Sequence, residues 1–196
     1  RLARYGFAGT MTGKRIVVAI GGGIAAYKTA TLVSRLVQLE HAVHVVLTHG
    51  ATNFVGPATF SALCGRPPVL DSYDPRFPLG AHIELAEGCD LLIIAPATAR
   101  LLASCALGLA DDLTATLYLA CQCPVLMAPA MSAPMWDKSS VQRHVTTLCE
   151  DGVQLVGPNS GWLSCRKQGT GRMAEADEIL EAALASLSGP DRSVLE

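Results

Sequence analysis

Three consecutive glycines, Gly21, Gly22 and Gly23, separate an apolar run from a helix-like pattern near the start of the chain. Backbone without Cβ atoms bends sharply and approaches a ligand closely, and the amide N–H groups of a helix that begins near Ile24 point toward that ligand. We expect an anion site here, most simply for a phosphate. The spacing of Gly21, Gly23 and Ala26 fits G-x-G-x-x-G/A, although an ordinary strand-to-helix turn explains these glycines equally well.

Two other side chains are candidates for proton chemistry. His82 follows a polar, proline-rich loop, and an imidazole titrates near neutral pH. The residues around His82 favour a capping or surface role when taken alone. Cys165 lies in the segment 157–173, which has four glycines and no clear periodicity. Loops of that length in compact domains are often functional lids, and a plain connector is the alternative.

Apolar runs and helical periodicity alternate along the chain. The runs at 16–20, 42–47, 90–95, 125–128 and 153–156 predict strands, and the intervening segments 24–39, 57–64, 98–107, 111–121 and 139–149, with 175–187 at the end, predict helices. This alternation predicts one three-layer α/β domain with a mostly parallel sheet over residues 14–188. We expect residues 1–13 and 189–196 to be flexible tails. Ligands of such sheets bind beyond the carboxyl ends of the strands.

Composition restricts the classes of partner. Only 16% of the 196 residues are charged and the net charge is -2, so no basic surface for nucleic acid is expected. No apolar run reaches the roughly 18 residues that suggest a membrane span. The mean hydropathy of +0.34 is high for a soluble monomer, which favours a homo-oligomer. The seven cysteines show no CxxC and no histidine at metal-ligand spacing, so we expect reduced thiols in a cytoplasmic protein and no metal.

Six short motifs occur in a fixed order: GGGIAAYK, T-x-x-A-x-x-F from Thr48, His82-Ile83, APATA from Ala95, PAMSAPMW from Pro129 and GTGRM from Gly169. Together they resemble the homo-oligomeric flavin-containing cysteine decarboxylases, the family of phosphopantothenoylcysteine decarboxylase and the peptidyl-cysteine decarboxylases. The resemblance covers residues 14 to about 176. It implies an FMN-binding, three-layer Rossmann-like (flavodoxin-like) fold, assembly as a trimer or a dodecamer, and an FMN site shared between subunits.

The resemblance also implies roles for individual residues. His82 becomes the catalytic histidine that accepts the thiol proton, and Cys165 the cysteine that donates a proton in a final reduction. The residues expected to bind FMN are Gly21, Gly22, Gly23, Ile24, Thr48, Pro96, Ala97 and Thr98. Those expected to bind the substrate are Met131, Ser132, Gly169, Gly171, Arg172 and Met173.

Two departures from the family pattern bear on the substrate. Ser132 stands where the family has an asparagine associated with the substrate carboxylate, and Arg100 and Leu101 replace Asn and Thr of a PASANT segment. These changes favour the C-terminal cysteine of a peptide, oxidatively decarboxylated to an aminoenethiol. The first alternative is phosphopantothenoylcysteine, in coenzyme A biosynthesis. A second is a non-catalytic flavin-binding regulatory subunit, and a flavin prenyltransferase is a weaker third.

Overall fold

A computed structural model describes residues 13–188, and the expected flexible tails lie outside this range apart from Gly13. Five parallel strands form the central sheet in the order β2-β1-β3-β4-β5. Their bounds are β1 Arg15–Ile20, β2 Ala42–Leu47, β3 Leu91–Ala97, β4 Val125–Pro129 and β5 Gln154–Leu155. The inner strands are buried on both faces, which explains their continuous apolar sequences.

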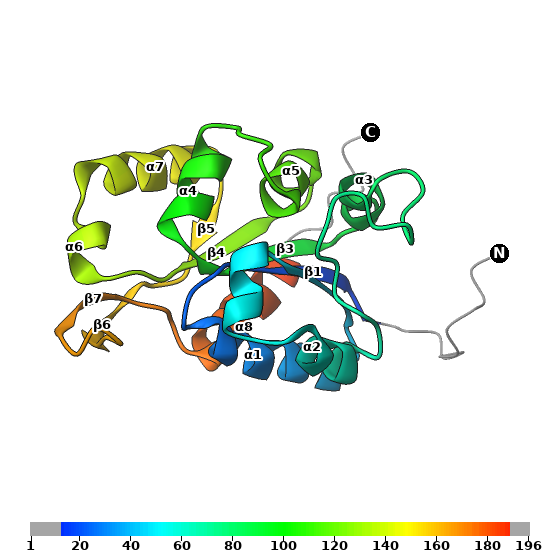
Figure 1. The fold of residues 1–196 in the computed structure, drawn as a ribbon, viewed down its shortest axis with the longest axis horizontal. Coiled ribbons are helices and arrows are strands. Elements are labelled where there is room, and N and C mark those ends of the chain that lie inside the picture. The colour runs from blue at the N-terminus through cyan, green and yellow to red at the C-terminus, as the bar shows by residue number, and fades with distance from the viewer. Residues whose placement is uncertain (1–12, 189–196) are drawn as a thin grey trace.

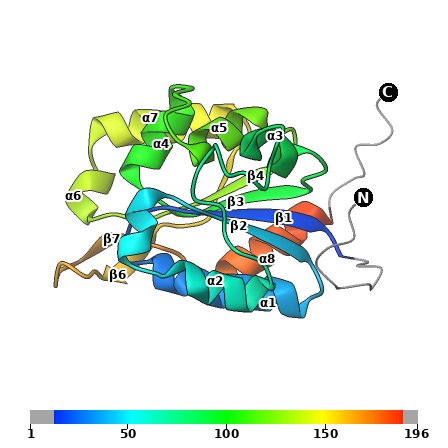
Figure 2. The same cartoon turned by 45° about the vertical axis from the view of Figure 1, so that its right-hand side comes forward.

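Helices cover both faces of this sheet, as Figures 1 and 2 show. One layer holds α1 Ala26–Gln38, α2 Pro57–Cys64 and α8 Ala176–Leu187; the other holds α3 Ala81–Ala86, α4 Ala99–Ala106, α5 Leu113–Ala120 and α7 Ser139–Glu150. Two shorter helices, η1 His49–Asn53 and α6 Ala133–Trp136, follow β2 and β4. The predicted three-layer fold with a mostly parallel sheet is confirmed.

Local sequence explains where several helices begin. Thr98 and Asp112 accept hydrogen bonds from the backbone N–H groups of Leu101 and Ala115, which caps α4 and α5. At α8, Glu175 and Glu178 form a reciprocal capping box. Among the described residues, no helix is long and apolar enough to cross a membrane.

The strand order reverses between β1 and β3, which creates the crevice where doubly wound sheets bind ligands. The glycine turn follows β1 at this point, and the Gly21 N–H donates to the carbonyl oxygen of Pro96 at the end of β3 (3.2 Å). The fold therefore places the predicted phosphate turn at the topological switch point.

Two segments differ from their predictions. β3 continues through Pro96, whose peptide bond with Ala95 is cis, because Ala97 still pairs with Pro129 of β4. The strand therefore runs two residues beyond its predicted end at 95. The glycine-rich segment 157–173 forms an antiparallel hairpin of β6 Asn159–Trp162 and β7 Gln168–Arg172. Its small polar residues give no apolar alternation, so periodicity could not reveal these strands.

Candidate functional site

The glycine turn fits closely against neighbouring backbone. A Cβ atom at Gly21 would lie 2.3 Å from the Pro96 carbonyl oxygen, and one at Gly22 would lie 2.7 Å from the carbonyl carbon of Gly50 in η1. Gly23 is open by comparison, with its nearest neighbour at 3.8 Å. The first two glycines are thus required for packing of the turn.

Unpaired amides are the feature of this turn that suits an anion. In the described part of the chain, the N–H groups of Gly22, Ile24 and Ala25 have no hydrogen-bond acceptor, whereas those of Gly21 and Gly23 bond to Pro96 and Gly21. Three free donors that precede α1 give the arrangement that binds a phosphate at a helix N-terminus. The residues present therefore fit the phosphate of FMN.

Thr48 binds the neighbouring backbone. Its hydroxyl donates to the carbonyl oxygen of Ile20 at 3.0 Å and accepts from the Ala51 N–H, so it joins the end of β1 to η1. Contact of Thr48 with FMN stays a prediction. The Thr52 hydroxyl instead bonds within η1, to the His49 carbonyl oxygen.

The end of β3 contributes mainly backbone to this region. Pro96 and Ala97 are buried, and the Ala97 carbonyl oxygen accepts from the Ala130 N–H. Thr98 is partly exposed, and its methyl group lies close to Gly21 and Gly23. Contact of these three residues with FMN remains a prediction, which the geometry favours most for Thr98.

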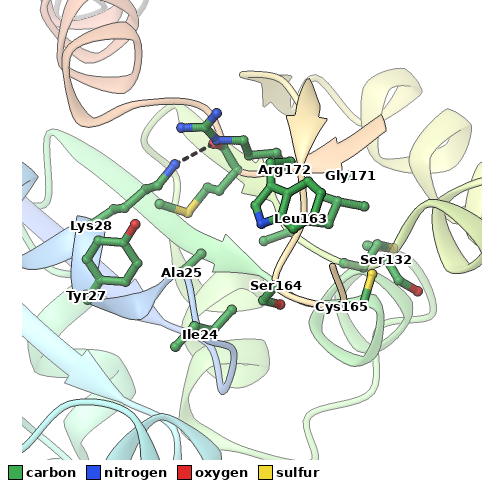
Figure 3. A pocket seen from close by; sticks show the side chains of 14 residues that line it. Ile24, Ala25, Tyr27, Lys28, Ser132, Leu163, Ser164, Cys165, Gly171 and Arg172 are labelled. Atoms are coloured by element: carbon green, nitrogen blue, oxygen red, sulfur yellow. Dashed lines mark hydrogen bonds between the residues drawn. The ribbon is translucent and has the colours of Figure 1, made fainter. Parts of the chain in front are cut away.

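A cavity of about 530 Å³ lies beside the glycine turn (Figure 3). The start of α1, the loop after β4 and the β6–β7 hairpin line it. Seven predicted site residues belong to its lining: Ile24, Met131, Ser132, Cys165, Gly171, Arg172 and Met173. The structure thus joins residues that are up to about 150 positions apart in sequence.

The hairpin docks on the loop after β4 through its glycines. The Met131 N–H donates to the Gly171 carbonyl oxygen at 2.9 Å, and a Cβ atom at Gly169 would lie 2.7 Å from that of Ala133. Gly169 therefore acts in packing and does not line the cavity. The turn of the hairpin carries the exposed Cys165 into the cavity wall.

Ser132 is the N-cap residue of α6, and its hydroxyl makes no hydrogen bond to that helix. Its carbonyl oxygen accepts from Met135 and Trp136, but its side chain makes no capping hydrogen bond. The hydroxyl can therefore bind a ligand in the cavity. It offers one donor where an amide side chain would offer two.

Three charged residues at the cavity were not assigned together from the sequence. Lys28 Nζ donates to Glu175 Oε1 at 2.8 Å and to the Met173 carbonyl oxygen at 3.3 Å, and Arg172 also binds Glu175. The Lys28 hydrogen bond, aided by the charges of Lys28 and Arg172, holds the pKa of Glu175 below its ordinary value. Two cations and one carboxylate leave a net charge of about +1 here, which attracts an anion.

Other residues that line the cavity were not predicted from the sequence, among them Tyr27 and three hairpin residues, Trp162, Leu163 and Ser164. For Tyr27 and Lys28 the sequence offered one signal, their position one helical turn beyond the glycines. In Figure 3 they come from the α1 side, whereas Ser132 and Cys165 lie on the opposite side of the cavity.

His82 lies elsewhere in the chain's own fold. It is in the first turn of α3, which Figures 1 and 2 place at the opposite end of the domain from the hairpin that carries Cys165. Its Nδ1 atom is buried and has no hydrogen-bond partner among the described residues. One copy of the chain therefore does not bring the two predicted catalytic residues together.

Arg100 does not enter the cavity. Its guanidinium binds Asp111 at 2.9 Å and Asp112 at 2.8 Å, which connects α4 to the start of α5. The pairing with Asp112 raises the pKa of Arg100. The replacement of the motif asparagine thus has a structural explanation.

The sequence that forms this site matches a known protein family. A model of the flavoprotein family matches residues 7–188. The chain belongs to the flavoprotein family. This membership, together with the free amides, supports FMN as the cofactor, as predicted.

Two curated relatives are named as bifunctional proteins. The coenzyme A biosynthesis bifunctional protein CoaBC of Haemophilus influenzae is 46% identical over 173 residues, and that of Bacillus subtilis is 38% identical over 174. Each match covers 88% of this chain and 43% of the relative, so the chain spans less than half the length of these relatives.

Solved structures of flavoproteins share the fold. A PPC decarboxylase variant complexed with pantothenoylaminoethenethiol has a TM-score of 0.79 and 28% identity, over 88% of this chain and 97% of that one. The FMN-dependent cysteine decarboxylase SpaF has a TM-score of 0.73 and 30% identity, over 88% and 98%. The suspected family of FMN-dependent cysteine decarboxylases is confirmed.

Proposed function

We propose that the chain catalyses the FMN-dependent decarboxylation of phosphopantothenoylcysteine. Sequence departures at Ser132 and Arg100 favoured a peptide, but the CoaBC relatives support the alternative better. The cavity that holds Ser132, Cys165 and Arg172 is the observation that carries the proposal. Arg100 in place of the motif asparagine no longer favours a peptide substrate, because its guanidinium pairs with Asp111 and Asp112.

Charge supports a phosphorylated substrate. Lys28 and Arg172 line the cavity, and one carboxylate, that of Glu175, pairs with both. The Lys28 side chain is only 10% exposed, so its charge is weakly screened. We assign the cationic side to the anionic end of the substrate. The Ser132 hydroxyl then binds the carboxylate of the cysteine moiety, on the side where Cys165 also lies.

The reaction divides into proton and electron transfers. Bound FMN would supply the two-electron oxidation of the substrate thiol to a thioaldehyde. His82 takes the thiol proton, and loss of CO2 leaves an enethiol. Cys165 gives a proton when the enethiol is reduced to the thiol by the two electrons that bound FMN would return. Lys28 and Ser132 hold the substrate, and the hairpin covers it from water.

A second copy of the chain completes this site. Ile24, Tyr27 and Trp162 are exposed at the cavity, and Leu79 and Ile83 are exposed beside His82 at the other end of the domain. Two different apolar surfaces that meet head to tail form a ring when the rotation between copies closes, and the expected trimer, alone or within a dodecamer, is such a ring. Such a contact brings His82 of one copy to the cavity of the next. We expect the assembly to act in the cytoplasm on a small molecule, without nucleic acid or membrane.

The test uses two substrates and one variant. Phosphopantothenoylcysteine and a peptide with a C-terminal cysteine are each incubated with the FMN-loaded wild type and Cys165→Ser, and the products are weighed by mass spectrometry. We expect the wild type to convert phosphopantothenoylcysteine to phosphopantetheine, and Cys165→Ser to accumulate its enethiol. Turnover of the peptide alone would restore the peptide assignment. No turnover of either would support a regulatory subunit.

A further inference from the structure

Three thiols meet far from the cavity. The Sγ atoms of Cys89, Cys121 and Cys123 all lie within 4.8 Å of one another, and all three residues are half-buried. Cys89 stands between α3 and β3, and Cys121 and Cys123 stand between α5 and β4. Sequence spacing did not reveal this group, because Cys89 is more than thirty positions from the other two and reaches them only through pairing of β3 with β4.

Their place in the fold separates this thiol cluster from the flavin site. The cysteines precede β3 and β4, so they lie at the amino ends of the strands, whereas the glycine turn and the cavity lie at the carboxyl ends. Backbone hydrogen bonds hold two of the three residues in place. The Cys89 N–H donates to the Ala86 carbonyl oxygen at 3.1 Å, and the Cys121 N–H donates to that of Leu117 at 2.9 Å.

We propose that Cys89, Cys121 and Cys123 form a three-thiolate site for a thiophilic metal ion, Zn²⁺ or Cu⁺. A metal–sulfur bond of about 2.3 Å puts the sulfur atoms of such a site about 4 Å apart, so the separations here need only a small contraction. Thiolates select these soft or borderline ions over Mg²⁺ and Ca²⁺. Zn²⁺ would take its fourth ligand from solvent, whereas Cu⁺ is satisfied by three sulfurs.

Metal binding displaces the thiol protons of all three cysteines, including the one that Cys89 donates to the Leu91 carbonyl oxygen at 3.3 Å. The bound ion ties the end of α3 to the end of α5 and the start of β4.

Metal binding is measured on the FMN-loaded full chain. Zn²⁺ and, under anaerobic conditions, Cu⁺ are each titrated in competition with a chromophoric chelator. We expect one ion per chain in at least one of the two titrations. Tight Zn²⁺ binding would assign a site with a solvent ligand, and tight Cu⁺ binding a three-coordinate one.

Single variants test whether the cluster holds the ion. Cys89→Ser, Cys121→Ser and Cys123→Ser should each weaken binding by more than the roughly 10–100-fold cost of losing an outer-shell partner. Cys64→Ser is the matched control, since Cys64 is also half-buried but lies on the opposite face of the sheet. It should bind as the wild type does.

Alkylation of the wild type covers the case in which a variant fails to fold. Bound metal should protect Cys89, Cys121 and Cys123 from iodoacetamide and leave the exposed Cys149 reactive, as mapped by peptide mass spectrometry. The proposal would be overturned if the wild type bound neither ion, or if all four variants lost binding equally. Unchanged alkylation of the cluster in the presence of the ion would also overturn it.

Discussion

The Met131 N–H donates to the carbonyl oxygen of Gly171 at 2.9 Å, and this bond fastens the β6–β7 hairpin to the loop that follows β4. Gly171 has a φ of 144°, and a Cβ atom on it would lie 2.2 Å from the Met131 carbonyl oxygen. Both the backbone conformation and the close contact thus require glycine. The position of Cys165 in the cavity wall depends on this attachment.

Gly171→Ala should therefore detach the hairpin and reduce turnover. Backbone strain of about 1–3 kcal/mol, with the clash added, corresponds to a loss of at least roughly tenfold. Steady-state kinetics with a cysteine-containing substrate measure it, and FMN content should stay at the wild-type level because the glycine turn is untouched. Gly56→Ala is the control, since nothing lies within 4 Å of its Cβ position. Equal activity in the two variants would contradict this role.

Gly22→Val should remove the cofactor. The added side chain collides with the backbone of Gly50, so η1 must move away from the turn that holds the free amides. We expect wild-type protein to be yellow with about one FMN per chain and the variant to be nearly colourless. Absorbance of the released flavin, divided by protein concentration, gives the ratio. A variant that keeps a full complement of FMN would show that the turn does not bind the phosphate.

His82→Asn should keep FMN and assembly but lose turnover. His82 lies on α3, away from the glycine turn, so its removal leaves the cofactor site intact. Flavin content and size-exclusion chromatography should match the wild type, while the rate falls by about 10²–10⁴-fold, as expected for loss of a general base. Unaltered rates would return His82 to a surface role.

Mixed oligomers test whether the site is shared. When His82→Asn and Cys165→Ser chains are unfolded, combined in equal amounts and refolded together, a site between copies contains both native residues in roughly a quarter of cases. We expect phosphopantetheine formation to recover to about that fraction. Each variant refolded alone is the control. Absence of any recovery, with the mixed assembly demonstrated by differential tagging, would place the whole site within one chain.

The sequence predicted elements whose signals are local. The strand 42–47 and the helix 57–64 match β2 and α2 at both ends, because a β-branched run and a proline start mark them. The glycine turn was found for the same reason. The β6–β7 hairpin was not, since its strands are held by docking of Gly169 and Gly171 on neighbouring backbone.

Site residues that depend on tertiary contacts were the harder part. The Lys28 side chain is held by its ion pair with Glu175, nearly 150 positions later in the sequence. Cys89 lies near Cys121 only because β3 pairs with β4. The separation of His82 from Cys165 was likewise invisible, because motifs in register give their order along the chain but not which copy supplies each one. Family resemblance suggested the two residues, and the structure shows that α3, which carries His82, lies at the opposite end of the domain from the hairpin that carries Cys165.

His44 should make stability depend on pH in a defined window. Burial lowers its pKa to about 4, and the charges of Arg66 and Arg15 add to the shift, while Cys89 opposes it. Arg66 lies 2.8 Å from His44 Nε2, where the neutral ring accepts a hydrogen bond. The unfolded chain, with an ordinary pKa of 6.5, binds the proton more readily, so the free energy of unfolding falls as pH drops from about 6.5 to about 4. Above 6.5 both states are neutral at His44 and its contribution is constant.

Urea unfolding at pH 7 and at pH 4.5 measures this effect in the wild type and in His44→Gln. Glutamine can accept a hydrogen bond from Arg66 but does not titrate. Between pH 7 and pH 4.5 the free energy of unfolding should therefore fall by up to about 3 kcal/mol less in the variant than in the wild type. His49→Gln, at an exposed position on η1, is the matched control and should follow the wild type. Parallel pH profiles for wild type and His44→Gln would show that His44 takes up its proton equally well in the folded and unfolded chains.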